Sequence, residues 1–156
     1  MSAIETKKRK KVLAVSSSGG HWVQLCRILP AFGDFEVVFV SVIESYREQM
    51  PESRFYLVND ATRWNKCGLI MLAIRIAWIV AKEKPDVVVS TGAAPGYFAV
   101  LFGHLCRAKT IWLDSIANIE QLSMSGSWIG RHADLWLTQW PHLAKIEGPY
   151  YGGSVL

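Results

Sequence analysis

The sequence predicts an α/β domain with a doubly wound, parallel, Rossmann-like sheet. Short apolar runs rich in β-branched residues alternate with longer segments of helical character, which is the pattern of such sheets. The chain has 156 residues, which is the size of a single domain, and its 51% hydrophobic content is enough for a full core. The first apolar run also ends in a glycine-rich turn, which is typical of a strand followed by a helix.

The first strand is predicted at residues 12–15, and Ser16-Ser17-Ser18-Gly19-Gly20-His21 follows it as a turn. The two glycines leave the backbone open to a ligand, and the N–H groups of a helix starting near Trp22 carry the positive end of its dipole. The spacing is not that of the dinucleotide fingerprint, and no Gly-Lys-Ser/Thr follows, which excludes typical NAD enzymes and P-loop NTPases. The turn predicts a phosphate site; the alternative is a sharp βα turn without a ligand.

The rest of the chain repeats this order of a strand followed by a turn and a helix. Further strands are predicted at residues 35–40, 54–58, 84–90, 109–113 and 134–138, with helices at 22–29, 65–84 and 97–106. Ligands of parallel sheets bind outside the carboxyl ends of the strands. Three segments should therefore converge on one crevice, contributing Gly19, Gly20, His21, Thr91, Gly92, Ala93, Asp114 and Ser115.

The helix predicted at residues 66–82 has a core, residues 69–81, that is apolar except for Arg75. This core is shorter than the roughly 20 residues that span a bilayer. Arg75, Trp78 and Lys82 fall at i, i+3 and i+7, which places a basic and aromatic stripe beside the apolar surface, as at a membrane interface. The alternative is a buried crossover helix, and we expect both roles, with one face on the sheet and the rest on lipid.

Charge and cysteine content also bear on location. Residues 7–11 are five consecutive basic residues in a chain of net charge +4, which favours contact with anionic lipid, the alternative being a solvated start to the chain. No zinc-ligand array or other nucleic-acid motif is present, so no nucleic-acid partner is expected. Cys26, Cys67 and Cys106 are expected to be reduced core cysteines, and without a signal peptide they indicate the cytosolic side.

With these segments in place, the chain resembles the acceptor-binding half of GT-B glycosyltransferases related to the lipid II-forming enzyme. It is most similar to the split members, namely the membrane-associated subunit of the N-acetylglucosaminyltransferase of dolichol-linked oligosaccharide synthesis and its bacterial relatives in exopolysaccharide and capsule assembly. The segments that carry the resemblance are 17–21, 85–92, 114–117, 122–126 and 139–141. The resemblance implies a single GT-B N-terminal-type domain.

The resemblance also implies a function. The chain would be a subunit of an inverting glycosyltransferase that binds a polyprenyl-diphosphate-linked sugar acceptor and recruits a nucleotide-sugar-binding subunit to the cytoplasmic face of the membrane. No cofactor or metal is implied. The alternatives are a non-catalytic membrane scaffold and, less favoured, a stand-alone nucleotide-binding enzyme.

The implied site residues fall into two groups. His21 and Asp114 are candidate catalytic residues, and the acceptor diphosphate would be bound by Ser18, Gly19, Gly20, Thr91, Gly92, Ala93, Ser115 and Asn118. Asp114 stands where the family usually has Glu, and Asn118 where it has a basic residue. The alternative for His21 is a helix cap or diphosphate ligand, and for Asp114 a structural carboxylate that holds the 115–120 loop.

The predicted domain organisation has three parts. Residues 1–11 form a basic arm, residues 12–146 the Rossmann-like domain, and residues 147–156 a tail that would dock on the partner. A full GT-B enzyme continues at this tail into a nucleotide-sugar-binding domain, so we expect that domain on a separate chain. The docking residues would be Tyr150, Tyr151, Val155 and Leu156, the alternative being a final edge strand of the same sheet.

Overall fold

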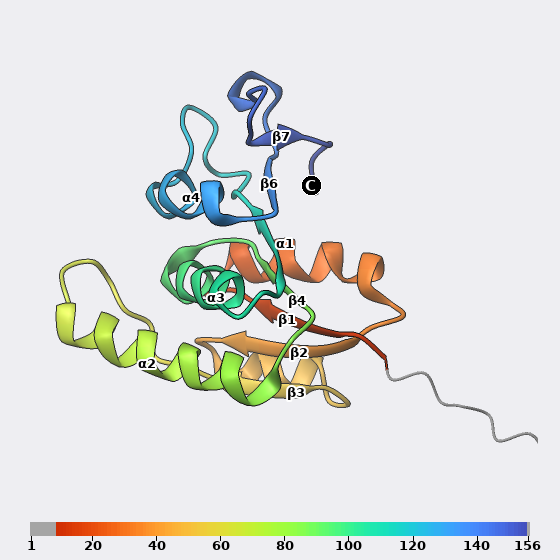
Figure 1. The fold of residues 1–156 in the computed structure, drawn as a ribbon, viewed down its shortest axis with the longest axis vertical. Helices are drawn as coiled ribbons and strands as arrows, with labels where there is room; N and C mark the ends of the chain where they lie inside the picture. Colours follow the sequence, from red (N-terminus) through yellow and green to blue (C-terminus); the bar gives the residue numbers. More distant parts are fainter. Residues whose placement is uncertain (1–8, 156) are drawn as a thin grey trace, which may run out of the picture.

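A seven-stranded parallel sheet forms the centre of the molecule (Figure 1). The computed structural model describes residues 9–155. The strands lie in the order β3-β2-β1-β4-β5-β6-β7, and their bounds are β1 Lys11–Val15, β2 Glu36–Ser41, β3 Arg54–Leu57, β4 Val87–Ser90, β5 Lys109–Leu113, β6 Leu135–Thr138 and β7 Tyr150–Tyr151. The doubly wound, parallel, Rossmann-like fold predicted from the sequence is confirmed.

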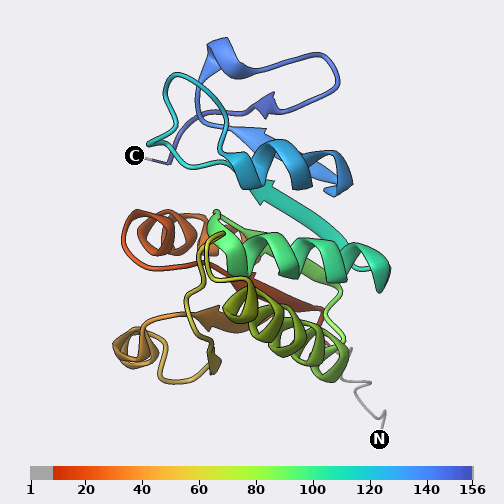
Figure 2. The same ribbon diagram turned by 90° about the vertical axis from the view of Figure 1, so that its left-hand side faces the viewer.

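Helices cover both faces of the sheet. Helix α1 (Gly20–Ile28) lies on one face, whereas α2 (Lys66–Glu83), α3 (Ala93–Leu105) and α4 (Met124–Ile129) lie side by side on the other (Figure 2). Four short 3-10 helices complete the described chain, namely η1 (Leu29–Phe32), η2 (Glu44–Gln49), η3 (Gly130–His132) and η4 (Pro141–Leu143). No helix among the described residues has both the length and the hydropathy needed to cross a membrane.

The alternation of side chains along the strands explains the two layers. Leu13 and Val15 enter the core beneath α2 and α3, while Val12 and Ala14 enter the core beneath α1. All four residues are fully buried. A strand that is apolar on both faces is typical of a parallel sheet with helices on each side.

The register places three turns at one edge of the sheet. Val15, the last residue of β1, pairs with Ser90, the last residue of β4, and Ser90 pairs with Trp112 near the end of β5. The chain order reverses between β1 and β4, because β2 and β3 extend the sheet to one side and β5 to β7 to the other. Crevices at such reversal points are the usual ligand sites of these sheets.

Several local expectations need correction. Cys67 and Cys106 are exposed and Cys26 is half-buried, because the first two lie at helix ends outside the packed faces. Lys11 belongs to β1, where its ammonium group pairs with Glu83 at 3.0 Å, and is not part of a solvent-facing arm. Lys7 and Lys8 of the basic run, and Leu156 of the tail, lie outside the described residues.

Candidate functional site

The α1 turn, residues 16–20, exposes backbone donors at the carboxyl end of β1. Ser18, Gly19 and Gly20 are exposed, and Gly19 has φ 63°, a left-handed conformation that favours glycine. The first helical hydrogen bond runs from the N–H of Val23 to the carbonyl of Gly19, so the three preceding N–H groups have no helical partner. The first turn of α1 contains no acidic residue. The turn can therefore receive an anion.

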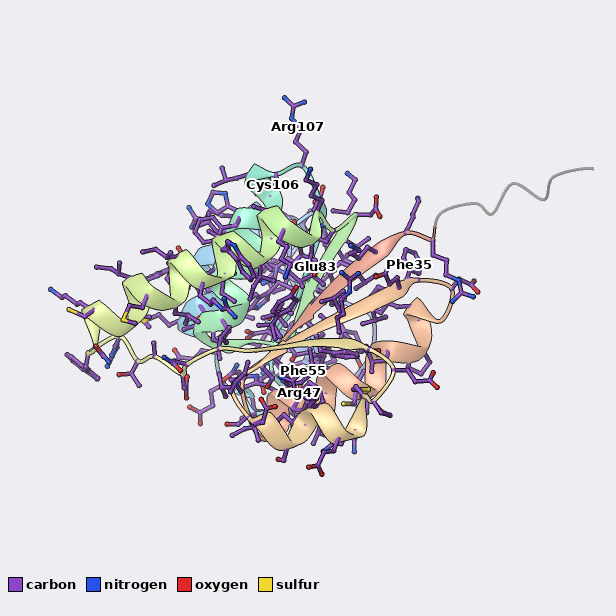
Figure 3. All side chains as sticks on the ribbon, turned by 90° about the horizontal axis from the view of Figure 1, so that it is seen from below. Phe35, Arg47, Phe55, Glu83, Cys106 and Arg107 are labelled. Carbon is purple, nitrogen blue, oxygen red and sulfur yellow. The ribbon has the colours of Figure 1, made fainter. Side chains whose placement is uncertain are left out.

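Tyr46 supports the α1 turn from outside and was not predicted from the sequence. Its hydroxyl accepts a hydrogen bond from the Gly19 N–H at 3.0 Å, and its ring stacks on Trp22 with centroids 4.5 Å apart. The guanidinium of Arg47 lies over the ring of Phe55, 5.1 Å from its centroid, and holds η2 against the sheet (Figure 3). No local pattern in the sequence indicates a contact between residues 27 positions apart.

The α3 turn, residues 90–93, lies beside the α1 turn, because β1 and β4 are paired neighbours in the sheet. Gly92 has φ 136° and Ala93 has φ 64°, which is uncommon for a residue with a side chain and is often found at functional sites. The N–H of Gly92 donates to the hydroxyl of Ser90 at 3.1 Å. Helix α3 begins without a side-chain cap or an acidic residue in its first turn, so its positive end is available to a ligand.

His21 joins the two turns. Its Nδ1 lies 2.7 Å from the carbonyl oxygen of Thr91, and the hydroxyl of Thr91 donates back to the carbonyl of His21 at 2.6 Å. Because a carbonyl oxygen can only accept, Nδ1 carries the proton, and in the neutral ring Nε2 keeps a lone pair. That nitrogen can take a proton from a hydroxyl group or, once protonated, donate to a phosphate.

Gly92 makes room for this ring. A Cβ atom built on Gly92 would lie 2.5 Å from Cε1 of His21, which is closer than such contacts allow. The absence of a side chain at residue 92 is therefore required by the position of the imidazole. Packing against His21, another predicted site residue, therefore explains why residue 92 is a glycine.

Asp114 directly follows β5 and is buried, with only 1% of the residue exposed. Its carboxylate accepts hydrogen bonds from the Trp112 indole at 3.2 Å, the Asn118 amide at 3.3 Å, and both the N–H and hydroxyl of Ser123. These contacts anchor the 115–123 loop and the start of α4, in agreement with the alternative of a structural carboxylate. In this arrangement the Asp114 carboxylate is not exposed to a ligand. Among residues 9–155, no three His, Cys, Asp or Glu side chains gather as a metal site.

Two buried glutamines, which were not predicted as site residues, connect α1 to the loop after β5 and to the end of β6. The amide of Gln24 donates to the hydroxyl of Ser115 at 3.2 Å and accepts from the N–H of Ile116 at 3.1 Å. Gln139 donates to the side-chain oxygen of Gln24 and to the carbonyl of Asp114. Gln24 is a polar residue on the buried, otherwise apolar face of α1, one turn after His21. A glutamine among apolar residues of a predicted helix was the sequence signal that could have identified it as a site residue.

Helix α2 presents the predicted stripe beside an apolar surface. The Arg75 guanidinium and the Lys82 ammonium each lie 4.7 Å from the ring centroid of Trp78. We call Ile70, Met71, Ile74 and Trp78 the lipid face of α2, after the role that the sequence predicts for this helix; these residues are 60%, 64%, 66% and 45% exposed. The opposite side of α2 is buried on the sheet, which was one of the two roles expected for this helix.

The tail returns to the domain. Tyr150 and Tyr151 form β7 beside β6, and each is 46% exposed. Beyond β7, the N–H of Val155 donates to Gln139 at 2.9 Å and its carbonyl accepts from Arg27 at 2.7 Å. The final described residues therefore contact the same glutamine that bonds to Gln24 of α1 and to Asp114.

Known proteins share this fold. MurG from Acinetobacter baumannii matches with a TM-score of 0.73 and 12% identity over 91% of this chain. UDP-N-acetylglucosamine 2-epimerase from Rickettsia bellii matches with a TM-score of 0.70 and 14% identity over 94% of this chain. The chain spans 44% and 45% of the lengths of these two structures, so it corresponds to less than half of each.

Curated relatives match over most of their length. The UDP-N-acetylglucosamine transferase subunit alg14 of Schizosaccharomyces pombe is 24% identical, over 99% of this chain and 89% of its own length. The corresponding subunit of Homo sapiens is 24% identical, over 93% of this chain and 82% of its own. The family described as "Oligosaccharide biosynthesis protein Alg14 like" matches residues 49–154, more than half of the chain. The family resemblance is thereby confirmed, and the chain belongs to the Alg14-like family of oligosaccharide biosynthesis proteins.

Proposed function

We propose that this chain is the acceptor-binding subunit of a two-component, inverting glycosyltransferase that extends a polyprenyl-diphosphate-linked sugar. A separate subunit would bind the nucleotide-sugar, which by the names of the curated relatives is UDP-N-acetylglucosamine. The observation that carries the proposal is the meeting of the α1 and α3 turns around His21, with the first turns of both helices free of acidic residues.

The two turns would bind the diphosphate of the acceptor. The N–H groups of Gly20, His21 and Trp22 precede the first helical hydrogen bond of α1, and the start of α3 adds a second positive helix end. Two helix ends that face one site suit a ligand with two linked phosphates. Ser18 is exposed within the α1 turn and can donate its hydroxyl.

His21 would take the proton of the acceptor hydroxyl. The hydroxyl oxygen forms a bond to the anomeric carbon of the donor sugar, and the bond from that carbon to the nucleoside diphosphate breaks with its electron pair on the leaving group. The proton moves to Nε2 of His21, while the Thr91 carbonyl stabilises the imidazolium through Nδ1–H. We assign Asp114 the supporting role of holding the 115–123 loop, in accordance with its buried hydrogen bonds.

The chain would associate with the cytoplasmic face of the membrane without crossing it. The lipid face of α2 supplies exposed Ile and Met side chains, and Arg75 and Lys82 flank Trp78 as in an interfacial helix. The free thiols of the three cysteines are in keeping with a reducing compartment. Arg9 and Lys10, the described part of the basic run before β1, are exposed and can add attraction to anionic lipid.

The experiment that tests this function is a transfer assay with the purified chain and its partner subunit, using UDP-sugars and a polyprenyl-diphosphate-linked acceptor. The pair should transfer sugar, and each chain alone should not. Retained transfer by the partner alone on a water-soluble acceptor would instead support the non-catalytic scaffold.

His21→Ala separates base from ligand in the same assay. A base predicts a kcat lowered by about 100-fold or more at saturating acceptor, the range of general base catalysis. A diphosphate ligand predicts a raised KM for the acceptor with kcat nearly unchanged. Wild-type kinetics in a folded His21→Ala variant would remove His21 from the site.

A further inference from the structure

A cavity lies on the face of the sheet opposite α1. It has a volume of about 320 Å³, within the range of small-ligand sites, which is roughly 300–1,000 Å³. Its walls are apolar and aromatic apart from Arg63 and Ser125, and include Leu69, Ala94, Tyr97, Phe98, Met124 and Trp128. We call this cavity the apolar pocket.

The apolar pocket adjoins the site at the α3 turn. Leu69, Ala94 and Met124 belong to the first turns of α2, α3 and α4, so the pocket lies toward the carboxyl edge of the strands. These helices lie side by side in Figure 2. Ala94 directly follows Ala93 of the α3 turn, and Gly92 of the same turn packs on His21. A ligand bound at the α3 turn can therefore extend into the pocket.

Arg63 provides a positive charge at this pocket. Its guanidinium lies 4.6 Å from the ring centroid of Trp64, and Nη1 lies 3.9 Å from the sulfur of Met124. Within residues 9–155 it forms no ion pair with a carboxylate, and it is exposed at the surface. An uncompensated cation beside an apolar cavity is complementary to a ligand with an anionic group joined to an apolar chain.

We propose that the apolar pocket binds the first isoprene units of a polyprenyl diphosphate, with Arg63 paired to the phosphate next to the lipid. This inference rests on the proposed function, because it assumes that the diphosphate lies at the α1 and α3 turns. Methyl-branched isoprene units contact the rings of Tyr97, Phe98 and Trp128, and the chain then leaves toward the membrane. The lipid face of α2 contributes none of its residues to the pocket, so the two apolar surfaces are separable by mutation.

The test uses farnesyl diphosphate, a short soluble prenyl diphosphate, and calorimetric titration of the whole chain. Farnesyl diphosphate should bind at least tenfold more tightly than either inorganic diphosphate or farnesol, because it alone occupies both halves of the site. Ser125→Leu fills the pocket and should lower the affinity for farnesyl diphosphate about tenfold, a loss of about 1.4 kcal/mol in binding free energy. The affinity for inorganic diphosphate should not change.

Arg63→Gln should also lower the affinity for farnesyl diphosphate at least tenfold. Because Arg63 is exposed, this variant should fold even if Ser125→Leu does not, and it then provides the test. Lys66→Gln, an exposed cation close in sequence that does not line the pocket, is the matched control and should bind like wild type. Equal affinity of wild type for farnesyl diphosphate and inorganic diphosphate would overturn the proposal.

Two other outcomes separate this inference from the proposed function. If Gly20→Val abolishes farnesyl diphosphate binding while Arg63→Gln and Ser125→Leu bind normally, the pocket assignment is wrong and the acceptor site stands. If Arg63→Gln weakens binding to phosphatidylserine vesicles but not to farnesyl diphosphate, Arg63 contacts a lipid headgroup and the pocket assignment is again wrong. Failure of wild type to bind any prenyl diphosphate, together with no transfer by the reconstituted pair, would reject both.

Discussion

The position of His21 depends on two neighbours that belong to another turn. The carbonyl of Thr91 fixes the proton on Nδ1, and Gly92 leaves the space that the ring occupies. Thr91 lies 70 positions from His21 in the chain, yet β1 and β4 are adjacent strands. The tautomer of the candidate base is therefore set by the topology of the sheet.

Gly92→Ala tests this dependence. The new Cβ would lie 2.5 Å from His21 and must displace the ring, and Ala at φ 136° is strained by an amount on the order of 1–3 kcal/mol. We expect Gly92→Ala to have a lower Tm. We also expect its transfer activity per folded molecule to be lower than that of wild type. Gly152→Ala, where no atom lies within 4 Å of the added Cβ, should keep wild-type transfer. Full activity of Gly92→Ala would mean that the position of His21 does not matter.

At the scale of elements, Glu83 joins the end of α2 to the strands (Figure 3). It is 2% exposed and contacts Lys11 of β1 and both Arg54 and Tyr56 of β3. Burial opposes its charge, but the hydrogen bonds from Tyr56 and Lys11 and the charges of Lys11 and Arg54 outweigh burial and hold the pKa of Glu83 below its ordinary value.

A lowered pKa means that ionised Glu83 stabilises the fold. This contribution is complete above the ordinary pKa of Glu, about 4.3, and is lost as the pH falls through the folded pKa. Glu83→Gln should lower the free energy of unfolding at pH 7 by about 1–3 kcal/mol and flatten its pH dependence below about pH 4.3. Urea unfolding at several pH values measures both, with the exposed Glu120→Gln as control. An unchanged pH dependence in Glu83→Gln would contradict this account.

The lipid face of α2 gives a second prediction at this scale. Ile74→Glu places a charge on a side chain that is 66% exposed, so Tm should stay near the wild-type value. Vesicle binding should fall at least tenfold, because a charge must then enter the apolar region of the bilayer. Val23→Glu on α1, where Val23 is 48% exposed on the other face of the sheet, is the matched control and should bind vesicles normally in a sedimentation assay. Equal loss in both variants would remove α2 as the lipid contact.

The first six strands and the helices α1, α2 and α3 were predictable because their signals are local, whereas α4 was not predicted. Apolar, β-branched strands and the alternation with helices identified six of the strands, and glycine turns located the ends of β1 and β4. Strand β7 was not predicted as Tyr150–Tyr151, because two residues carry too little periodicity. The prediction that the cysteines are buried was wrong for a related reason. Cys67 and Cys106 lie in apolar stretches, but the sequence does not show that they stand at the ends of helices, where they are exposed.

At the scale of the whole molecule, the part of the site that escaped prediction consists of long-range contacts. Tyr46 reaches the α1 turn from η2, and Gln139 reaches Gln24 from the end of β6. Such contacts depend on the loop paths between strands, which no spacing in the sequence specifies. The contact of His21 with Thr91, and that of Ser115 with α1, were predictable, because all parallel strands end at the same edge.

The tail gives a prediction about assembly. Deleting residues 150–156 would remove β7 and the hydrogen bonds of Val155, so it should lower Tm and cannot report on docking alone. Replacing Tyr150 and Tyr151 together by Ser keeps the backbone of β7 and removes two half-exposed rings. If these rings anchor the partner, Tm should change little while co-purification with the nucleotide-sugar-binding subunit is lost. Retained co-purification would remove β7 from the interface.

The central claim, that the glycine turns bind the acceptor diphosphate, is tested most directly by one binding measurement. A polyprenyl-diphosphate-linked sugar in nanodiscs is titrated with the wild-type chain and with Gly20→Val. The substitution places a branched side chain at the exposed start of α1, and its Cβ would lie 3.7 Å from Nε2 of Gln24, an ordinary contact. We predict that Gly20→Val stays folded and binds the acceptor at least tenfold more weakly, a loss of about 1.4 kcal/mol or more. Equal acceptor affinity of the folded variant and wild type would contradict the claim.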